Sequence, residues 1–344
     1  MLLEPCNLPP LGDLSSRVAM AAMTRGFAAP GHLATDDIAA YYGRRAEDGV
    51  GLILTEGTII DHSGDGYNNV PHIETAEQAA SWKPVIERVQ AAGGKIYSQL
   101  WHCGRISHSD YTGGKPPVSS TGIAAEGHNR QNDKPFGQPH ALTAEEMPAI
   151  HAMFRKAARN AIDAGFDGVQ LHMGHGYLID QFFDSRVNQR TDAYGGSVEN
   201  RCRLALECLE TVIAEVGAEK TMIRISPSRE MGGIYDWPDL DEMLAYLIPA
   251  LDGLGLRALD ISCAASDYFQ TSGRVIRMVR ANWPHFLMGG ASLTQEQAEA
   301  ELVDGWLDIV TWGRHILGNP DFVTRLRENS EIAPFDREML GELR

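Results

Sequence analysis

Two histidines and a tyrosine stand close together in the middle of the chain, as His172, His175 and Tyr177. They follow a short apolar run at 167–171, which is bounded upstream by Ala164-Gly165-Phe166 and is typical of a buried strand. The end of such a strand would bring two imidazoles and a phenol into one place. These groups are suited to hydrogen-bond donation and to general acid catalysis.

Two other roles for these three side chains have to be weighed against catalysis. Histidines three residues apart can bind a metal, but zinc needs three or four ligands, and no third ligand with suitable spacing stands nearby. We therefore expect no metal site. The side chains would otherwise only satisfy hydrogen bonds in a polar loop, as a lone histidine usually does. Two histidines and a tyrosine together favour chemistry.

The composition limits the compartment and the partners. The chain has 344 residues, with 30 basic and 46 acidic side chains and a formal charge of −16, which disfavours binding to nucleic acid or to an anionic membrane. Its five cysteines form no CxxC pair, which indicates a reducing compartment. No run of about 18 apolar residues and no signal peptide is visible, so we expect a soluble cytoplasmic protein.

Short β-like runs alternate with amphipathic helical patterns from end to end, which predicts an α/β fold built from βα units. Eight such runs favour closure into a (β/α)8 TIM barrel. The predicted strands cover 18–21, 51–55, 95–100, 168–172, 221–226, 258–262, 286–289 and 309–311. The predicted helices include 76–90, 144–164, 198–216, 239–251, 295–303 and a segment after Asn319-Pro320.

The segment 107–139 interrupts this alternation after the third strand and is rich in Gly, Pro, Ser and His. It is too long for an ordinary connection inside a compact domain, so we expect a lid or cover over the active site. No internal repeat and no linker with a change of composition is visible. We therefore predict one domain over 1–344.

The carboxyl ends of the strands form the active site of an α/β barrel, so residues there can be considered together. The last two predicted strands end at Gly289-Gly290 and before Gly313-Arg314, a pattern that suits phosphate binding but also ordinary tight turns. Arg224 lies inside an apolar strand, and a buried cation needs an anion. That partner is Glu56, another structural carboxylate, or an electron-rich ligand.

Taken together, the sequence resembles the Old Yellow Enzyme family of FMN-dependent ene-reductases, within the NADH:flavin oxidoreductases. The matching motifs run in the family's order and extend to Gly313-Arg314 and Asn319-Pro320-Asp321 near the end of the chain. They include Ala19-Met20-Ala21-Ala22-Met23-Thr24-Arg25, Gln99-Leu100-Trp101-His102, Gly176-Tyr177-Leu178-Ile179-Asp180-Gln181-Phe182, and the segments 51–58, 164–169 and 188–201.

The resemblance implies a tightly bound, non-covalent FMN. Thr24 would hydrogen-bond the flavin C4 carbonyl, with the backbone of Ala22 and Met23 beside the ring. Gln99 would bind the pyrimidine edge, and Arg224 would lie near N1 and the C2 carbonyl, where the reduced flavin becomes negative. Gly57 would let the backbone approach the ring. The phosphate would be held by Gly290, Gly313 and Arg314.

The resemblance also implies a reaction. His172 and His175 would hydrogen-bond the carbonyl or nitro oxygen of an activated alkene while hydride arrives from flavin N5, and Tyr177 would protonate the α-carbon. Many relatives have asparagine where this chain has His175. NADH or NADPH would reduce the flavin over the same face, so ping-pong kinetics are expected. The pocket aromatics would be Tyr67, Trp101 and, in the family-variable segment 264–272, Tyr268.

Two alternative functions stay open at this stage. One is a dedicated biosynthetic or catabolic flavin reductase, or a redox-neutral isomerase, on the same scaffold. The other is a barrel that binds phosphate without flavin, such as an aldolase or a noncatalytic binder. The buried or reactive state of Cys103 is open, and so are the role of the atypical tail from Ala333, the natural substrate, the nicotinamide preference, and the choice between monomer and homo-oligomer.

Overall fold

Eight parallel strands close into a barrel in the computed structural model, which describes residues 1–230, 232–264 and 266–344. The strands follow one another around the barrel in chain order, and the last pairs with the first. The prediction of a (β/α)8 barrel is therefore confirmed, and each strand overlaps one of the predicted runs. The barrel strands are β3 (Val18–Met20), β4 (Leu52–Ile59), β5 (Lys95–Trp101), β10 (Gly168–His172), β11 (Thr221–Ile225), β14 (Ala258–Ile261), β15 (Phe286–Gly290) and β16 (Ile309–Trp312).

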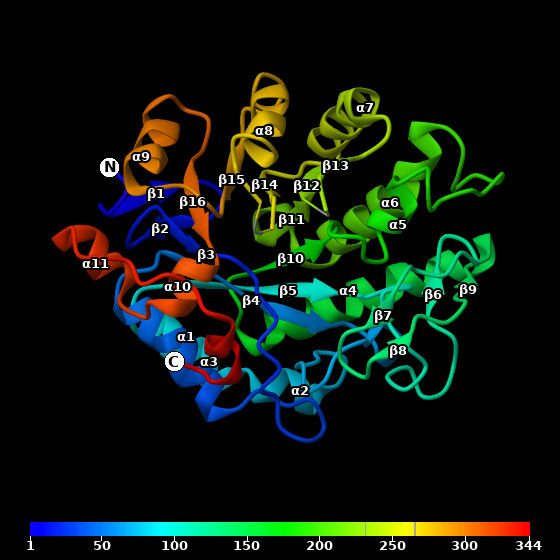
Figure 1. The fold of residues 1–344 in the computed structure, drawn as a ribbon, viewed down its shortest axis with the longest axis horizontal. Coiled ribbons are helices and arrows are strands. Elements are labelled where there is room, and N and C mark those ends of the chain that lie inside the picture. The colour runs from blue at the N-terminus through cyan, green and yellow to red at the C-terminus, as the bar shows by residue number, and fades with distance from the viewer. Residues whose placement is uncertain (231, 265) are drawn as a thin grey trace.

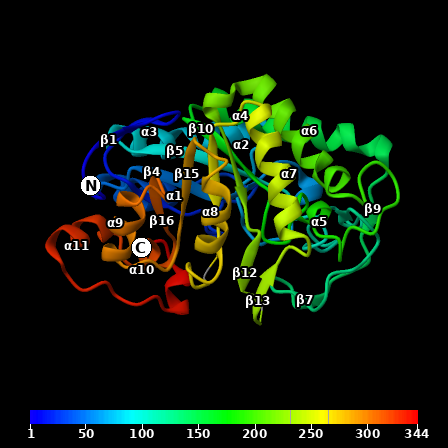
Figure 2. The same ribbon diagram turned by 90° about the horizontal axis from the view of Figure 1, so that it is seen from above.

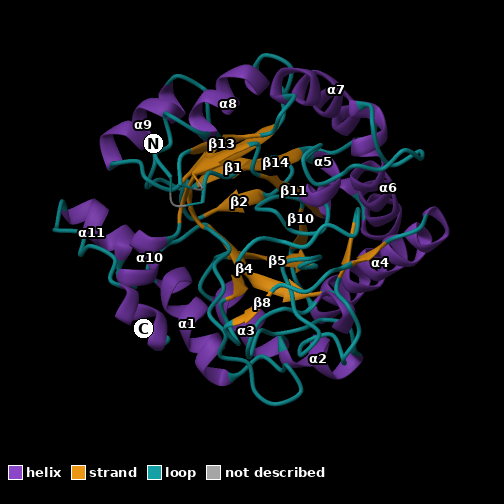
Figure 3. Cartoon of the chain, turned by 45° about the vertical axis from the view of Figure 1, so that its right-hand side comes forward, coloured by secondary structure: helices purple, strands orange, loops and turns teal. Residues whose placement is uncertain are grey.

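Helices surround the barrel strands on the outside (Figure 3). Their buried faces pack on the outer face of the strands in one continuous apolar core. The longer helices are α1 (Asp36–Glu47), α3 (Lys83–Ala91), α4 (Met147–Ala164), α6 (Val198–Val216), α7 (Leu240–Gly253), α8 (Ser272–Arg280) and α9 (Gln295–Val303). Shorter ones are α2 (Ala76–Ser81), α5 (Asp180–Phe183), α10 (Arg314–Gly318) and α11 (Phe322–Glu328).

The helices differ from the prediction in a few places. The predicted helix 76–90 is two helices, because Trp82 ends α2 and Pro84 lies in the first turn of α3, where a missing backbone N–H costs nothing. A 3-10 turn at Ala144–Glu146 precedes α4. The prediction did not name α1 and α8, which complete the ring. The capping box at Thr294 and Gln297 is present at the start of α9.

One end of the barrel is closed by the N-terminal hairpin of β1 (Cys6–Leu8) and β2 (Gly12–Leu14). Leu8, Leu11 and Leu14 of this hairpin pack with barrel residues such as Leu52 and Met222. The hairpin keeps water out of the amino ends of the strands, so the opposite end is left for the active site.

The insertion 107–139 lies at the carboxyl ends of the strands, beyond the arrowhead of β5 (Figure 1). It carries β6 (Val118–Ser119), β7 (His128–Asn129) and β8 (Lys134–Pro135), and β6 pairs with β9 (His140–Ala141) just beyond it. The Asn129 side chain donates to the Gly66 carbonyl at 3.0 Å, which ties the insertion to the loop after β4.

A second hairpin, β12 (Ser228–Glu230) with β13 (Ile234–Asp236), follows β11. Figure 2 shows it beside α7 and α8. Arg274 of α8 forms an ion pair with Asp236 at 2.6 Å and holds the hairpin there. Among the described residues, no helix has the length and apolar character needed to cross a membrane.

We predict that Gly168→Ala destabilises the strand that carries His172. A Cβ at Gly168 would lie 2.4 Å from the Tyr97 ring and 2.7 Å from the Lys220 carbonyl oxygen, so the neighbours must shift. Overpacking of this kind costs about 1–3 kcal/mol, which thermal unfolding would detect as a lower melting temperature.

The matched control is Gly253→Ala at the end of α7, where a Cβ would meet nothing within 4 Å. This variant should unfold at or slightly above the temperature of the parent protein. An unchanged melting temperature for Gly168→Ala would contradict the prediction.

Candidate active site

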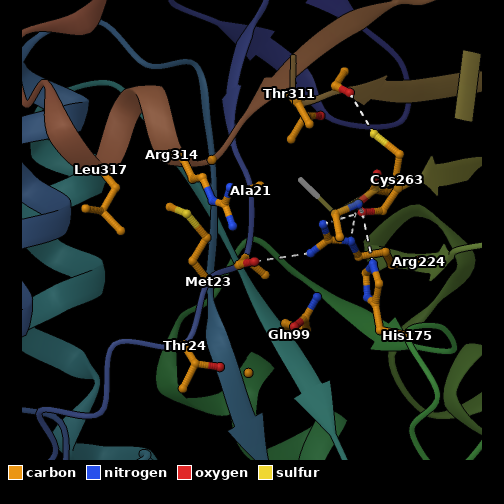
Figure 4. Close-up of a pocket in the computed structure, with 18 of the residues that line it drawn as sticks. Ala21, Met23, Thr24, Gln99, His175, Arg224, Cys263, Thr311, Arg314 and Leu317 are labelled. Carbon is orange, nitrogen blue, oxygen red and sulfur yellow. Dashed lines mark hydrogen bonds and ion pairs between the residues drawn. The ribbon is translucent and has the colours of Figure 1, made fainter. Parts of the chain in front are cut away.

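A cavity of about 800 Å³ opens at the carboxyl ends of the barrel strands (Figure 4). Its volume lies within the roughly 300–1,000 Å³ typical of small-molecule sites. The structure brings most of the predicted site residues together there, although they are far apart in sequence. The predicted residues that line it are Ala22, Met23, Thr24, Gly57, Gln99, Trp101, His172, His175, Tyr177, Arg224, Gly290, Gly313 and Arg314.

His172, His175 and Tyr177 meet at the end of β10. The two imidazoles are 5.1 Å apart between ring centroids, and the Tyr177 ring is 5.1 Å from His172. His175 Nδ1 lies 3.3 Å from His172 Nε2, so these two ring nitrogens face one another.

A tight turn after β10 holds this arrangement. His175 has a φ of 59° and Gly176 a φ of 79°, so the chain reverses in the left-handed region. The backbone N–H of His175 donates to Ser226 Oγ at 2.6 Å, and that of Gly176 donates to the Asp180 carboxylate at 2.6 Å. These bonds offset the cost of the strained backbone and position both imidazoles.

The environment keeps all three groups neutral near pH 7. Burial lowers the pKa of His172 and of His175 well below the usual value, and the positive charges of Arg224 and Arg229 lower both further. Burial also raises the pKa of the Tyr177 phenol well above 10. The site therefore offers two neutral imidazoles and a protonated phenol.

Tyr67 lies behind Tyr177 rather than in the cavity wall. The two hydroxyl oxygens are 2.8 Å apart and share a hydrogen bond, and burial raises the pKa of Tyr67 to about 12. The Trp101 ring lies 4.8 Å from the Tyr67 ring and 4.9 Å from the Tyr177 ring. Tyr67 therefore contacts the proposed acid, whereas the sequence predicted contact with substrate.

Arg224 crosses the cavity between His175 and the segment of Met23 (Figure 4). Its Nε lies 3.2 Å from the Asp260 carboxylate, its Nη1 donates to the Ala22 carbonyl at 3.3 Å, and its Nη2 donates to Ser262 Oγ at 2.7 Å. The counter-charge is therefore Asp260 of β14, one of the alternatives that the sequence left open.

Glu56, the first partner considered for Arg224, has a different role. Its carboxylate accepts the backbone N–H groups of Arg25 and Gly26 at 2.8 and 2.9 Å. Burial raises the pKa of Glu56 to about 7. Glu56 thus shapes the loop after β3, just beyond Thr24.

Gln99 belongs to a buried polar chain across three strands. Its Nε2 donates to Gln170 Oε1 at 2.7 Å, and Gln170 Nε2 donates to the Asp260 carboxylate at 3.1 Å. Because Gln99 Nε2 gives one of its two hydrogens to Gln170, its carbonyl oxygen and its second amide hydrogen are left for a ligand in the cavity.

The ends of β15 and β16 form a close-fitting glycine wall. A Cβ at Gly290 would lie 2.4 Å from the Thr311 carbonyl oxygen, and one at Gly313 would lie 3.0 Å from Met23 Sδ. Thr311 and His315 line this part of the cavity, and their atoms Thr311 Oγ1 and His315 Nδ1 are buried without a hydrogen-bond partner. Buried polar atoms without partners indicate that a polar ligand belongs there.

Gly57 lines the cavity and also meets a packing requirement that the sequence did not predict. It lies at an irregularity in the pairing of β4 with β5. A Cβ on Gly57 would lie 2.3 Å from the Trp101 ring, so glycine is needed for Trp101 to pack.

The structure does not bring Tyr268 to the cavity. The phenol is fully buried, and its hydroxyl donates to the Glu301 carboxylate at 2.5 Å, so it braces α9. Tyr268 is therefore not a residue of this cavity. Within the predicted pocket segment 264–272, Ala264 lines the cavity, and residue 265 lies outside the described residues.

Cys103 is a packing residue. It is fully buried beside Ile59, Val70 and Trp101, and burial raises the pKa of its thiol well above the usual value. A thiol that stays protonated is a poor nucleophile.

Sequence reasoning missed several cavity residues. Asp260 lies in β14 and Ser262 follows that strand. Neither belongs to a distinct sequence motif, although the burial of Arg224 required a carboxylate. Arg130 comes from the insertion, and Phe335 and Arg337 come from the tail. The Arg314 guanidinium lies 5.1 Å from the Phe335 ring centroid, a cation–π contact that ties the tail to the glycine wall.

Comparison with known proteins agrees with this geometry. The sequence model of the NADH:flavin oxidoreductase / NADH oxidase family matches residues 1–332. The 12-oxophytodienoate reductase 7 of Oryza sativa subsp. japonica is 35% identical over 358 residues, which cover 98% of this chain and 90% of that protein.

Two solved structures have the same fold. An Old Yellow Enzyme homologue from Zymomonas mobilis superposes with a TM-score of 0.91 and 35% identity, covering 98% of this chain and 96% of that one. Morphinone reductase gives a TM-score of 0.89 and 34% identity, covering 98% and 92%. A further structure contains morphinone reductase in complex with tetrahydroNAD.

The fold and the site thus define a flavin-dependent oxidoreductase built on a (β/α)8 barrel. The chain belongs to the NADH:flavin oxidoreductase / NADH oxidase family, and more narrowly resembles its Old Yellow Enzyme homologues. It is an NAD(P)H-dependent enzyme with FMN as its cofactor. The unpaired Thr311 and His315 atoms and the close glycine wall fit such a cofactor.

Proposed function

We propose that the enzyme reduces activated C=C bonds of α,β-unsaturated carbonyl or nitro compounds. The observation that carries this proposal is the meeting of two neutral imidazoles and a protonated phenol in the cavity of a flavin oxidoreductase. These groups stabilise a developing negative oxygen and supply a proton, which are the two needs of a polarised alkene receiving hydride.

The cavity residues suggest how FMN is held. Ala22, Met23 and Thr24 would hold the ring, and Gln99 and Arg224 would bind its pyrimidine edge. Gly290, Gly313 and Arg314, at the ends of β15 and β16, would hold the phosphate. When bound, FMN would supply the hydride-transfer chemistry between NAD(P)H and the alkene.

His172 and His175 bind the substrate oxygen. Both donate a hydrogen bond to the carbonyl or nitro oxygen, and these bonds strengthen as that oxygen becomes negative. The donors are preorganised in a buried site, so little reorganisation is needed as charge develops.

Tyr177 then gives its hydroxyl proton to the α-carbon. Tyr67 stabilises the resulting phenolate through the 2.8 Å hydrogen bond between the two hydroxyls. Because NAD(P)H and the alkene use the same cavity in turn, the kinetics are ping-pong. A dedicated flavin reductase or a redox-neutral isomerase is the alternative on this scaffold.

A visible spectrum tests the proposal directly. The purified protein should show flavin bands that bleach anaerobically with NADPH and return with 2-cyclohexenone. Bleaching without return would favour a dedicated substrate or an isomerase. Reoxidation by 2-nitropropene but not by 2-cyclohexenone would restrict the substrates to nitroalkenes.

We predict that Tyr177→Phe slows alkene reduction about 100-fold or more, since a positioned acid contributes that much to a rate. Reduction of the flavin by NAD(P)H should stay nearly unchanged, because the phenol acts only in the oxidative half-reaction. Stopped-flow absorbance measures the two halves separately. Tyr97→Phe, at the far end of the barrel, is the control, and equal losses in both halves would refute the assignment of Tyr177.

We predict that His172→Ala weakens binding of p-hydroxybenzaldehyde about tenfold, because a phenolate imitates an enolate oxygen and loses one charge-assisted hydrogen bond. Titration of the charge-transfer absorbance gives the Kd. His140→Ala, on the exposed segment of β9, should bind like the parent protein. Unchanged binding by the His172 variant would rule out this donor role.

We predict that Arg337→Gln weakens FMN binding about fivefold. An exposed ion pair contributes up to roughly 1 kcal/mol, which corresponds to this change in Kd. Binding of riboflavin, which lacks the phosphate, should not change. Fluorescence titration of the apoprotein measures both flavins, and Arg344→Gln on the same tail, outside the cavity, is the control. An equal loss for the two flavins would assign Arg337 another role.

A further inference from the structure

Ser262 is the first residue after β14, and its hydroxyl lies beside the His175 imidazole. The residue is buried, with 6% of its surface exposed. Three nitrogen atoms surround Ser262 Oγ: Arg224 Nη2 at 2.7 Å, the Ala264 backbone N at 3.2 Å, and His175 Nε2 at 3.3 Å. None of these residues was chosen by sequence reasoning as a partner of His175.

The hydroxyl can satisfy these three neighbours in one way only. A guanidinium and a backbone N–H can only donate, so Arg224 and Ala264 use both lone pairs of Ser262 Oγ. The remaining contact must use the hydroxyl hydrogen. Ser262 therefore donates to His175 Nε2, and that nitrogen is an acceptor.

This contact fixes the tautomer of His175. A neutral imidazole carries one hydrogen, so an accepting Nε2 places the hydrogen on Nδ1. Nδ1 is the atom that faces His172 Nε2 at 3.3 Å.

His172 is fixed in the same manner from its other side. The backbone N–H of Gly174 donates to His172 Nδ1 at 3.4 Å, which places the hydrogen of a neutral ring on Nε2. Both ring nitrogens that face one another therefore carry hydrogens. Two donors that converge without an acceptor need a ligand atom with two lone pairs.

We propose that Ser262 is a positioning residue that locks His175 in its Nδ1–H tautomer, so that both imidazoles donate to one oxygen of the substrate. This inference rests on the proposed function, since the oxygen is that of the carbonyl, nitro or phenolate ligand. With the other tautomer, His175 would present a lone pair to that oxygen and repel it.

The first test is spectroscopic and needs no substrate. In the FMN-loaded enzyme labelled with ¹⁵N-histidine, long-range ¹H–¹⁵N correlation distinguishes Nδ1–H from Nε2–H rings, and His175→Asn assigns the signals. We expect His175 to be Nδ1–H and His172 to be Nε2–H. A His175 ring that carries its hydrogen on Nε2 would overturn the proposal.

The second test is a double-mutant cycle with p-hydroxybenzaldehyde. Ser262→Ala should raise the Kd about tenfold or more, because His175 Nδ1 would then change from a hydrogen-bond donor to an acceptor. Ser262→Thr keeps the hydroxyl, so its Kd should stay within about twofold of the parent value. Asparagine at position 175 has no tautomers. In a His175→Asn background, Ser262→Ala should therefore change the Kd less than about twofold.

The cycle separates tautomer control from simple support of Arg224. If Ser262 acts only by holding Arg224 or the cofactor, the loss persists in the His175→Asn background, and the proposal is wrong. A Ser262→Ala variant with full affinity would also reject it. Failure of the proposed function differs from both, because the unmodified enzyme would then neither bind the phenol nor be reoxidised by an enone.

Discussion

The burial of one guanidinium is the interaction on which the rest of the site depends. Arg224 points from β11 into the cavity, where Asp260 balances its charge and the Ala22 carbonyl and Ser262 Oγ each accept one of its hydrogens. A buried cation without such partners would cost several kcal/mol. Its positive charge also lowers the pKa of His172 and His175, which favours neutral donors. One side chain thus influences the electrostatics of the cavity.

Arg224 and Asp260 belong to a series of polar side chains that extends across neighbouring strands. Gln99 and Gln170 link β5 and β10 to Asp260 on β14, and each amide in the chain has a partner. These hydrogen bonds restrict the side chains, because rotation of either amide would break a buried hydrogen bond. The barrel therefore does more than gather residues from distant parts of the sequence. It fixes which atom of each side chain faces the ligand.

Most of the barrel could be predicted from the sequence, because strand period and length are local properties, and all eight predicted runs overlap observed strands. The residues at the strand ends followed from the barrel rule and the family resemblance. What could not be predicted depends on contacts between distant segments. The choice of Asp260 over Glu56 for Arg224 is set by strand neighbours, and the position of Tyr67 behind Tyr177 depends on the hydrogen bond between their hydroxyls. Tyr268 was misplaced because the sequence shows an aromatic residue after a strand but not the Glu301 that binds it.

The segments that could be predicted least well are those at the rim of the cavity. Arg130 comes from the insertion, and Phe335 and Arg337 come from a tail that Arg25, Arg44 and Arg45 hold through its backbone carbonyls. Every residue has a backbone carbonyl, so these hydrogen bonds do not require particular side chains in the tail. The strand ends, in contrast, are constrained by close contacts such as Gly290 against Thr311. The strand ends at the cavity are thus held by close packing, whereas the rim is held mainly through backbone carbonyls of the tail.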